Sequence, residues 1–468
     1  MESGQTWRQF AIAGTANFVL LSIGYTMGWT APINVKLQSD EESPLDRPVT
    51  ADEEAWIGSL LTIGAILGAL IVGFPAARIG RKWTMLSTCL PLFVGWVLLA
   101  AATDVAMLYA GRICTGITMG MGFTIVPLYS AEIATDEYRG ALGSLLQVLL
   151  TMGFLLVYSV GPFVSYSAVV YVGIAVAAVY AIAIYFMPES PFYYLDKGDK
   201  ASAASCLATI RGQSEEGVMN ELDRMAADVA ASKEKTAKIT DLFRGNNFKA
   251  FYISMALVAF QQFSGINAVL FYLTNIFEAA GSSLDASIST IIIGSVQLGA
   301  SCVTPLAADR LGRKVLLMIS SAGTAVGLFL LGTYFVIADN ENPVAEQIGW
   351  LPVVALIIFI ITFCWGLGSL PWPIMAELFP IEVKVVAMPM VNAFCWILAF
   401  LITRYFSALA AATGMGVTFF IFGACCVVSF FFTLFLIPET KGKSFHEIQE
   451  LLSGGSGNTS SKTPTDKY

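Results

Sequence analysis

The feature that most constrains this sequence is a series of long apolar segments that carry almost no charge. A helix of about 20 apolar residues crosses the hydrocarbon core of a bilayer and satisfies its own backbone hydrogen bonds there. Because 56% of the residues are apolar and 13% are charged, we expect an all-α membrane protein with twelve transmembrane helices. These helices are expected at residues 10–34, 55–77, 84–103, 106–131, 142–163, 167–187, 250–278, 286–308, 315–338, 350–378, 385–409 and 415–437.

The twelve segments fall into two groups of six, separated by a stretch rich in Lys, Glu, Asp and Ala. Such a stretch is typical of short amphipathic helices on a membrane surface. The end of the chain, from about residue 453, has the composition of a disordered tail. The predicted divisions are a first six-helix half at 1–187, a cytosolic linker at 188–249, a second half at 250–437 and a cytosolic tail at 438–468.

Charge and histidine content exclude several classes of function. The net charge of −8 argues against a nucleic-acid partner, because such a protein needs a basic face for phosphates. The single histidine, His446, lies in the polar tail, so histidine catalysis and His-rich metal sites have almost nothing to work with. We therefore expect no enzyme activity, no cofactor and no metal site.

The distribution of Lys and Arg predicts the orientation in the membrane. With the N-terminus inside, all but four of the 26 basic residues face the cytosol. The positive-inside rule favours this topology, which places both termini in the cytosol. The four exceptions, expected on the outer side, are Lys36, Arg47, Arg112 and Arg404.

An internal repeat relates the two groups of helices. Three short patterns of the first group recur in the same order in the second, which indicates two homologous six-helix halves. The matched stretches are 77–82 with 309–314, Ala131, Glu132 and Arg139 with Ala376, Glu377 and Lys384, and 188–190 with 438–440.

Longer motifs carry a family resemblance. They are PLYSAEIATDEYRGALGSLLQ (127–147), PESP (188–191), QQFSGINAVLFY (261–272), DRLGRK (309–314), LPWPIMAELFP (370–380) and PETKGKS (438–444). Over essentially its whole length the chain resembles the sugar porter family of the major facilitator superfamily. In detail, YTMGWTAP (25–32) and PESPFYYL (188–195) are most similar to insect facilitated trehalose transporter-like proteins. The resemblance implies two pseudo-symmetric halves that carry a neutral sugar by alternating access.

The charges at the cytosolic helix ends are candidates for a gate. Charge-assisted pairs between neighbouring helices would hold the inner side shut and break when the halves separate. The alternative is that these charges only anchor loops and orient the chain. Because Ala77 stands where the family usually has Asp, we expect an asymmetric network that is fuller in the second half. The expected members are Arg78, Arg81, Glu132, Arg139, Glu189, Asp309, Arg310, Arg313, Glu377, Lys384 and Glu439.

Polar side chains inside the apolar segments are candidates for the substrate site, because an unpaired amide in hydrocarbon is costly. An ideal helix would not aim Gln261, Asn267 and Tyr272 at one ligand, so we expect a break near Ser264 and Gly265. The alternative role for each amide is a helix-to-helix hydrogen bond. By resemblance, most of these positions contact sugar in the family, and the two tryptophans offer flat faces to a sugar ring. The candidates are Gln147, Gln261, Gln262, Asn267, Tyr272, Gln297, Trp372 and Trp396.

The tenth segment contains a candidate hinge, formed by Gly366, Gly368, Pro371 and Pro373. Two glycines and two prolines disrupt a helix, and the alternative is a static kink. Two departures from the family leave the sugar open between a hexose and trehalose. Cys364 replaces a common carboxylate and Cys395 a common Asn, which we expect to remove hydrogen-bonding capacity.

The energy source is predicted from helix 1. Proton-driven sugar symporters of this fold carry an Asp after a Gly-Phe or Gly-Tyr pair, whereas here Thr26 follows Tyr25. We find no other carboxylate at mid-membrane, so we expect passive uniport. The alternatives are a proton-coupled symporter and a non-transporting sugar sensor. The expected partners are a small-molecule sugar and the lipid bilayer of the plasma membrane, with the chain functional as a monomer.

Overall fold

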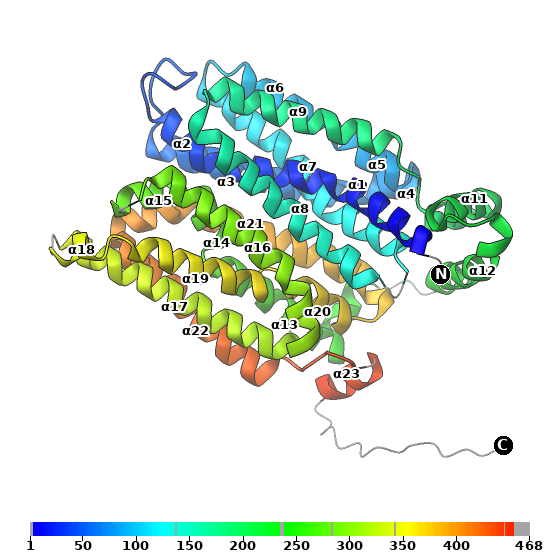
Figure 1. Cartoon of the computed structure of the whole chain (residues 1–468). Helices are drawn as coiled ribbons and strands as arrows, with labels where there is room; N and C mark the ends of the chain where they lie inside the picture. The colour runs from blue at the N-terminus through cyan, green and yellow to red at the C-terminus, as the bar shows by residue number, and fades with distance from the viewer. Residues whose placement is uncertain are drawn as a thin grey trace.

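The computed structural model describes residues 3–135, 138–234, 238–281, 284–340, 343–443 and 445–453, and the regular elements in these ranges are all helices. The predicted disordered tail, from about residue 453, lies almost wholly outside them. Figure 1 shows the helices gathered into one elongated bundle.

The first group of helices ends before the linker. Its elements are α1 Ser3–Gly28, α2 Thr30–Leu37, α3 Ala51–Ile71, α4 Gly73–Arg78, α5 Arg81–Ser87, α6 Cys89–Ala100, α7 Val105–Ile133, α8 Arg139–Val160, the 3-10 helix η1 Gly161–Phe163, and α9 Tyr166–Tyr185. Several spans consist of two elements in sequence, such as α3 with α4 and α5 with α6.

The linker forms helices whose first two members contact the first group, whereas its last, a 3-10 helix, contacts the second group. They are α10 Pro191–Asp196, α11 Lys200–Arg211, α12 Glu215–Glu234 and the 3-10 helix η2 Ile239–Phe243. Leu207 and Leu222 lie in a small core of their own. Arg211 joins this unit to α7, because its Nη1 donates to the carbonyl oxygen of Ile133 at 2.8 Å while its Nη2 lies 2.6 Å from Glu221.

The second group begins directly after the linker. Its elements are α13 Gly245–Phe263, α14 Ile266–Phe271, α15 Leu273–Ala280, α16 Ala286–Leu311, α17 Arg313–Asp339, α18 Val344–Gln347, α19 Leu351–Trp365, α20 Pro371–Leu378, α21 Ile381–Thr413 and α22 Met415–Leu436, followed by α23 Phe445–Ser453. Three elements, α13 to α15, replace the single predicted helix at 250–278.

Within the described residues, eleven helices are long and apolar enough to cross a membrane. The tenth predicted segment, 350–378, is split: α19 is apolar but has 15 residues, and α20 follows after a break. The break accounts for the difference between eleven continuous spans and the twelve that the sequence predicts.

The bundle has two distinct ends. In Figure 1, α11, α12, α23 and the start of α1 lie at one end, and α2 and α18 lie at the other. We call these the linker end and the distal end. The two groups of helices pack against each other through α3 with α21 and α8 with α16.

Contacts across the two groups are well developed toward the distal end. Arg404 of α21 forms an ion pair with Asp52 of α3, and its guanidinium lies 4.6 Å from the centre of the Trp56 ring. Tyr158 of α8 donates its hydroxyl to the carbonyl oxygen of Leu270 at 3.0 Å. These contacts hold the two groups together on the distal side.

Candidate substrate site and gate

The predicted break in the seventh span is present. Helix α13 ends at Phe263, and Gly265 adopts the left-handed conformation with φ +77° before α14 begins. A Cβ on Gly265 would come within 2.5 Å of the Phe422 ring, so this position requires glycine for both conformation and space. The break confirms the prediction made from the spacing of the polar residues.

The break brings three candidate residues into one buried cluster. Asn267 donates its Nδ2 to Oε1 of Gln262 at 2.5 Å, although five residues separate them. Gln262 in turn directs its Nε2 to the sulfur of Cys395 on α21 at 3.1 Å. We call Gln261, Gln262 and Asn267 the amide cluster; all three are buried.

Gln261 connects the amide cluster to the second break. Its Nε2 donates to the carbonyl oxygens of Leu367 at 2.8 Å and Gly368 at 3.1 Å. These carbonyls belong to the turn between α19 and α20, where Gly366 leaves helical geometry with φ −137°. A side-chain amide therefore satisfies backbone groups that the broken helix exposes.

The predicted hinge residues lie at or next to this second break. Gly366 and Gly368 are in the turn, while Pro371 and Pro373 occupy the first turn of α20. Proline suits that position because the first helical residues have no intrahelical acceptor for their N–H. The segment is broken rather than kinked, and its movement remains a prediction.

Cys395 makes two sulfur contacts with the amide cluster. Its sulfur accepts a hydrogen bond from Gln262 at 3.1 Å and lies 3.8 Å from Oε1 of Gln261. A thiol is a weaker hydrogen-bonding group than the amide common in the family, so the expected loss of capacity here is one of degree.

The other predicted substrate residues lie around this cluster. Tyr272 follows α14 and directs its hydroxyl to the carbonyl oxygen of Thr403 at 3.4 Å. Gln297 on α16 has a buried Oε1 that accepts no hydrogen bond from a described residue. Gln147 on α8 and Trp372 on α20 are half-buried.

Trp396 and one residue that the sequence analysis missed connect α21 to α7. The Trp396 ring lies 5.5 Å from the Phe123 ring, and Asn392 directs its Nδ2 to the Thr124 hydroxyl at 3.4 Å. Oδ1 of Asn392 is buried and unpaired among the described residues. An isolated amide in the apolar run 386–402 was the available signal for Asn392.

At the linker end, the first-half charges form a compact group. The Arg81 Nη2 lies 2.7 Å from Oε1 of Glu132, and Ser190 also donates to the Glu132 carboxylate. Glu189 accepts hydrogen bonds from the backbone N–H of Arg81 at 2.8 Å and of Lys82 at 3.1 Å. A carboxylate thus caps the N-terminus of α5.

The second half repeats this arrangement. Arg313 lies 3.5 Å from Glu377, and Glu439 accepts hydrogen bonds at 3.0 Å from the backbone N–H of Arg313 and of Lys314. Gly312 has φ +87°, and a Cβ there would come within 2.7 Å of the Glu439 carboxylate. The glycine leaves room for the capping carboxylate, and Gly80 does the same at φ +93° beside Glu189.

The chain matches the family described as "Sugar (and other) transporter" over residues 12–452. It belongs to the sugar transporter family. It is 35% identical to the facilitated trehalose transporter Tret1 of Apis mellifera ligustica, over 95% of this chain and 88% of that protein. It is 34% identical to a Tret1-2 homolog of Drosophila simulans, over 96% and 92%. Its relatives are transporters and not enzymes.

Solved structures confirm the major facilitator fold. The proton:xylose symporter XylE, bound to a bromodeoxyglucose, matches with a TM-score of 0.79 at 24% identity, over 96% of this chain and all of that one. A partially occluded inward-open XylE from E. coli matches with a TM-score of 0.78 at 23% identity, over 93% and 99%. At this identity the likeness concerns the fold alone.

In this sugar transporter, the described gate pairs lie within each half rather than between halves. Arg81 and Glu132 both belong to the first group of helices, and Arg313 and Glu377 both belong to the second. The expected half-to-half clamp is therefore not formed by these pairs. They fix neighbouring helices of one half to each other.

The expected fuller network in the second half depends on Asp309 and stays a prediction, whereas the two described pairs differ in distance and exposure. The Arg81 and Glu132 side chains are 15% and 10% exposed, against 22% and 30% for Arg313 and Glu377, and the first pair is also closer. In the first half, the Ser190 hydroxyl also donates a hydrogen bond to the Glu132 carboxylate. This bond forms although position 77 is Ala and not Asp. The side chain of Asp309 lies outside the described residues.

The remaining gate candidates are less central. Arg78 is exposed and lies 4.2 Å from the centre of the Phe74 ring, and Arg310 is exposed at the end of α16. Lys384 is partly buried at the start of α21, and this burial lowers the pKa of its ammonium. The side chain of Arg139 lies outside the described residues.

The two capping carboxylates differ in their pKa. Burial raises the pKa of Glu189 above its ordinary value, despite the backbone N–H groups that act in the other direction. Burial also tends to raise the pKa of Glu439. Hydrogen bonds from the backbone N–H groups of Lys441, Arg313 and Lys314 outweigh this effect and hold its pKa below the ordinary value. The second-half site therefore favours the charged carboxylate more than the first-half site does.

Arg112, one of the four basic residues predicted toward the outer side, is fully buried. Its side chain is 0% exposed. Its Nη1 donates to the carbonyl oxygen of Thr26 at 2.7 Å and its Nε to that of Ile57 at 3.0 Å. The guanidinium lies 5.3 Å from the centre of the Trp29 ring. Backbone carbonyls and an aromatic face replace the water that an exposed arginine would have.

Proposed function

We propose that this protein carries a neutral sugar, trehalose or a hexose, across the plasma membrane by facilitative uniport. It works by alternating access as a monomer, with both termini in the cytosol. The linker end is then the cytosolic end and the distal end is the outer end.

The amide cluster is the observation that supports this proposal best. A sugar presents hydroxyls that both donate and accept hydrogen bonds. A carboxamide can pair with them in both ways, because it has an N–H donor and a carbonyl acceptor. Gln261, Gln262 and Asn267 converge where one span is broken, and Gln261 reaches a second broken span. Discontinuous helices that carry polar groups to mid-membrane are typical of transporter binding sites.

The surroundings of Arg112 favour uniport over proton coupling. The guanidinium is held by carbonyl oxygens of Thr26 and Ile57, and in the described part of the chain it forms no ion pair with a carboxylate. Proton coupling requires a titratable group that gains and loses its proton during transport. Thr26 cannot serve in that role.

The contacts between the halves suit an alternating-access cycle. On the outer side, Arg404 with Asp52 and Tyr158 with Leu270 join the halves. On the cytosolic side, the described ion pairs stay within each half. Opening of the outer side would have to break the first set of contacts while it formed new ones on the cytosolic side.

Uptake of a panel of radiolabelled sugars into oocytes that express the full chain tests this proposal. We expect saturable uptake of trehalose or a hexose above the level of water-injected oocytes, at matched surface expression. Binding of a sugar to the purified protein without any flux would instead identify a sensor and contradict the transport function.

A further inference from the structure

Glu54 is a buried carboxylate at the distal end. It lies in the first turn of α3, just before the predicted apolar segment 55–77, and it is 6% exposed. Oε2 accepts a hydrogen bond from Gln38 at 2.7 Å, but Oε1 is buried and accepts none of normal geometry from a described residue. The amide of Asn34, which lies beside it, is equally without such a bond. A buried carboxylate oxygen without a hydrogen bond of normal geometry is costly.

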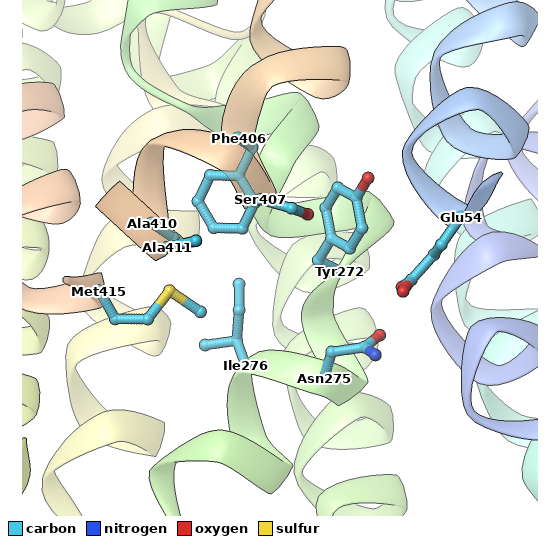
Figure 2. A pocket seen from close by; sticks show the side chains of 9 residues that line it. All are labelled: Glu54, Tyr272, Asn275, Ile276, Phe406, Ser407, Ala410, Ala411 and Met415. Carbon is cyan, nitrogen blue, oxygen red and sulfur yellow. The ribbon is translucent and has the colours of Figure 1, made fainter. Parts of the chain in front are cut away.

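Glu54 lines a cavity of about 320 Å³. Figure 2 shows Glu54 extending from α3 toward Tyr272, Asn275 and Ser407, which come from the other half of the protein. Oδ1 of Asn275 is a second buried oxygen that accepts no hydrogen bond from a described residue. Phe406 and Met415 form an apolar wall opposite Glu54.

We propose that this distal cavity is a second sugar-binding site, which external sugar occupies before it reaches the amide cluster. This inference rests on the proposed function. Hydroxyls of the sugar donate to the free oxygens of Glu54 and Asn275, and the C–H face of the ring packs on Phe406.

The lining of the cavity favours a sugar over a metal ion. Glu54 is the one carboxylate among its lining residues, whereas Ca²⁺ takes about six to eight oxygen ligands. A large part of the wall is apolar, which suits the mixed surface of a sugar ring. The volume lies near the lower end of the range of ligand pockets, roughly 300 to 1,000 Å³, so it fits a single sugar unit.

The cavity lies between the amide cluster and the outer side of the protein. Glu54 belongs to the first half and the other lining residues to the second, so a bound sugar bridges the halves on the outer side. Tyr272 lines the cavity and directly follows α14, which carries Asn267, so the cavity adjoins the amide cluster. A sugar arriving from outside meets this site first, whereas a sugar leaving the cytosol reaches the amide cluster from the other side.

The test compares sugar entry with sugar exit in oocytes that express the full chain. KM is measured for zero-trans entry and for zero-trans exit of the transported sugar, in the parent and in Glu54→Gln and Asn275→Ala. We expect each variant to raise the KM for entry, about five- to tenfold for Glu54→Gln, because the sugar loses one hydrogen-bonding oxygen of the carboxyl group. We expect the KM for exit to change less than twofold.

Asp40→Asn is the matched control, since Asp40 is an exposed carboxylate in the same outer region. It should leave both KM values unchanged. Equal changes in entry and exit, or none, in the two cavity variants would overturn the second site. Loss of a Na⁺, Ca²⁺ or proton dependence of entry in Glu54→Gln would also overturn it, because Glu54 would then hold a cation. Absence of any sugar flux in the parent would instead refute the proposed function itself.

Discussion

The Nε2 of Gln261 lies 2.8 Å from the carbonyl oxygen of Leu367, so a side chain from one broken span caps the exposed backbone of another. This bond joins α13 to the turn between α19 and α20. A sugar that takes up the Gln261 amide would have to compete with those carbonyls. In the proposed site, this contact would couple sugar binding to the geometry of the tenth span.

The first prediction concerns Gln261. Gln261→Ala removes a candidate sugar ligand and leaves two carbonyls uncapped, at a cost of about 1 to 3 kcal/mol. We expect a loss of transport efficiency between roughly fivefold and a hundredfold, with the protein still present at the surface. Initial uptake over a range of sugar concentrations measures it. Gln347→Ala, at an exposed amide of α18, is the control. Parent-like uptake at sub-saturating sugar would show that Gln261 is not part of the site.

Asn267 provides an independent test of the amide cluster. Asn267→Ala leaves Oε1 of Gln262 without its donor and removes a polar group that faces the break. We expect transport to weaken by a similar factor, with little change in surface level. If Asn267→Ala transports normally while Gln261→Ala does not, then the Gln261 effect comes from the α19–α20 turn and not from a shared sugar site.

Gly265 tests whether the break itself matters. Gly265→Ala adds a Cβ at φ +77° that meets the Phe422 ring, which costs about 1 kcal/mol in conformation besides the steric clash. We expect a clear fall in maximal transport. Adding Phe422→Leu should restore part of it by relieving the clash. A double variant no better than Gly265→Ala would mean that backbone conformation accounts for the whole loss.

The two gate arginines are predicted to differ. Arg81 forms the closer and more buried ion pair, so Arg81→Ala leaves Glu132 partly desolvated and unpaired. We expect Arg81→Ala to lower maximal transport more than Arg313→Ala, with both variants inserted in the parent topology. Uptake normalised to surface protein measures the difference. A larger loss in Arg313→Ala would show that the half containing Asp309 dominates the gate.

The capping carboxylates are predicted to respond oppositely to pH. The pKa of Glu439 is lowered in the fold, so its stabilising effect is present at neutral pH and is lost as the pH falls through the folded-state pKa. The pKa of Glu189 is raised, so its contribution is largest at acid pH and is lost as the pH rises through the folded-state pKa. At pH 7, Glu439→Gln should therefore lower the thermal unfolding temperature of the purified protein more than Glu189→Gln does. Equal shifts would contradict this assignment.

Much of this arrangement was predictable from sequence because lipid restricts the options. Apolar length predicted the spans, and the helical angle between Gln261 and Asn267 predicted the break. Thr50 and Glu53 form a capping box, and this pattern in the sequence places the start of α3 at Ala51. Hydropathy alone predicts a segment that begins at residue 55, four residues after the start of α3, and this prediction places Glu54 outside the membrane.

Other features depended on partners far away in the chain. Arg112 is buried because carbonyls of α1 and α3 reach it, which no local pattern indicates. The role of Cys395 requires Gln262 from another span. Whether a charge pairs within one half or across both is a question of helix packing, and the repeated motifs do not answer it.

The most direct test of the account is the final level of sugar inside the cell. Oocytes expressing the full chain are allowed to reach steady state with external sugar between about pH 5.5 and 7.5, with and without a protonophore. The account predicts uptake that is insensitive to both conditions and stops when the internal and external concentrations are equal. Accumulation above the external concentration that the protonophore abolishes would contradict it.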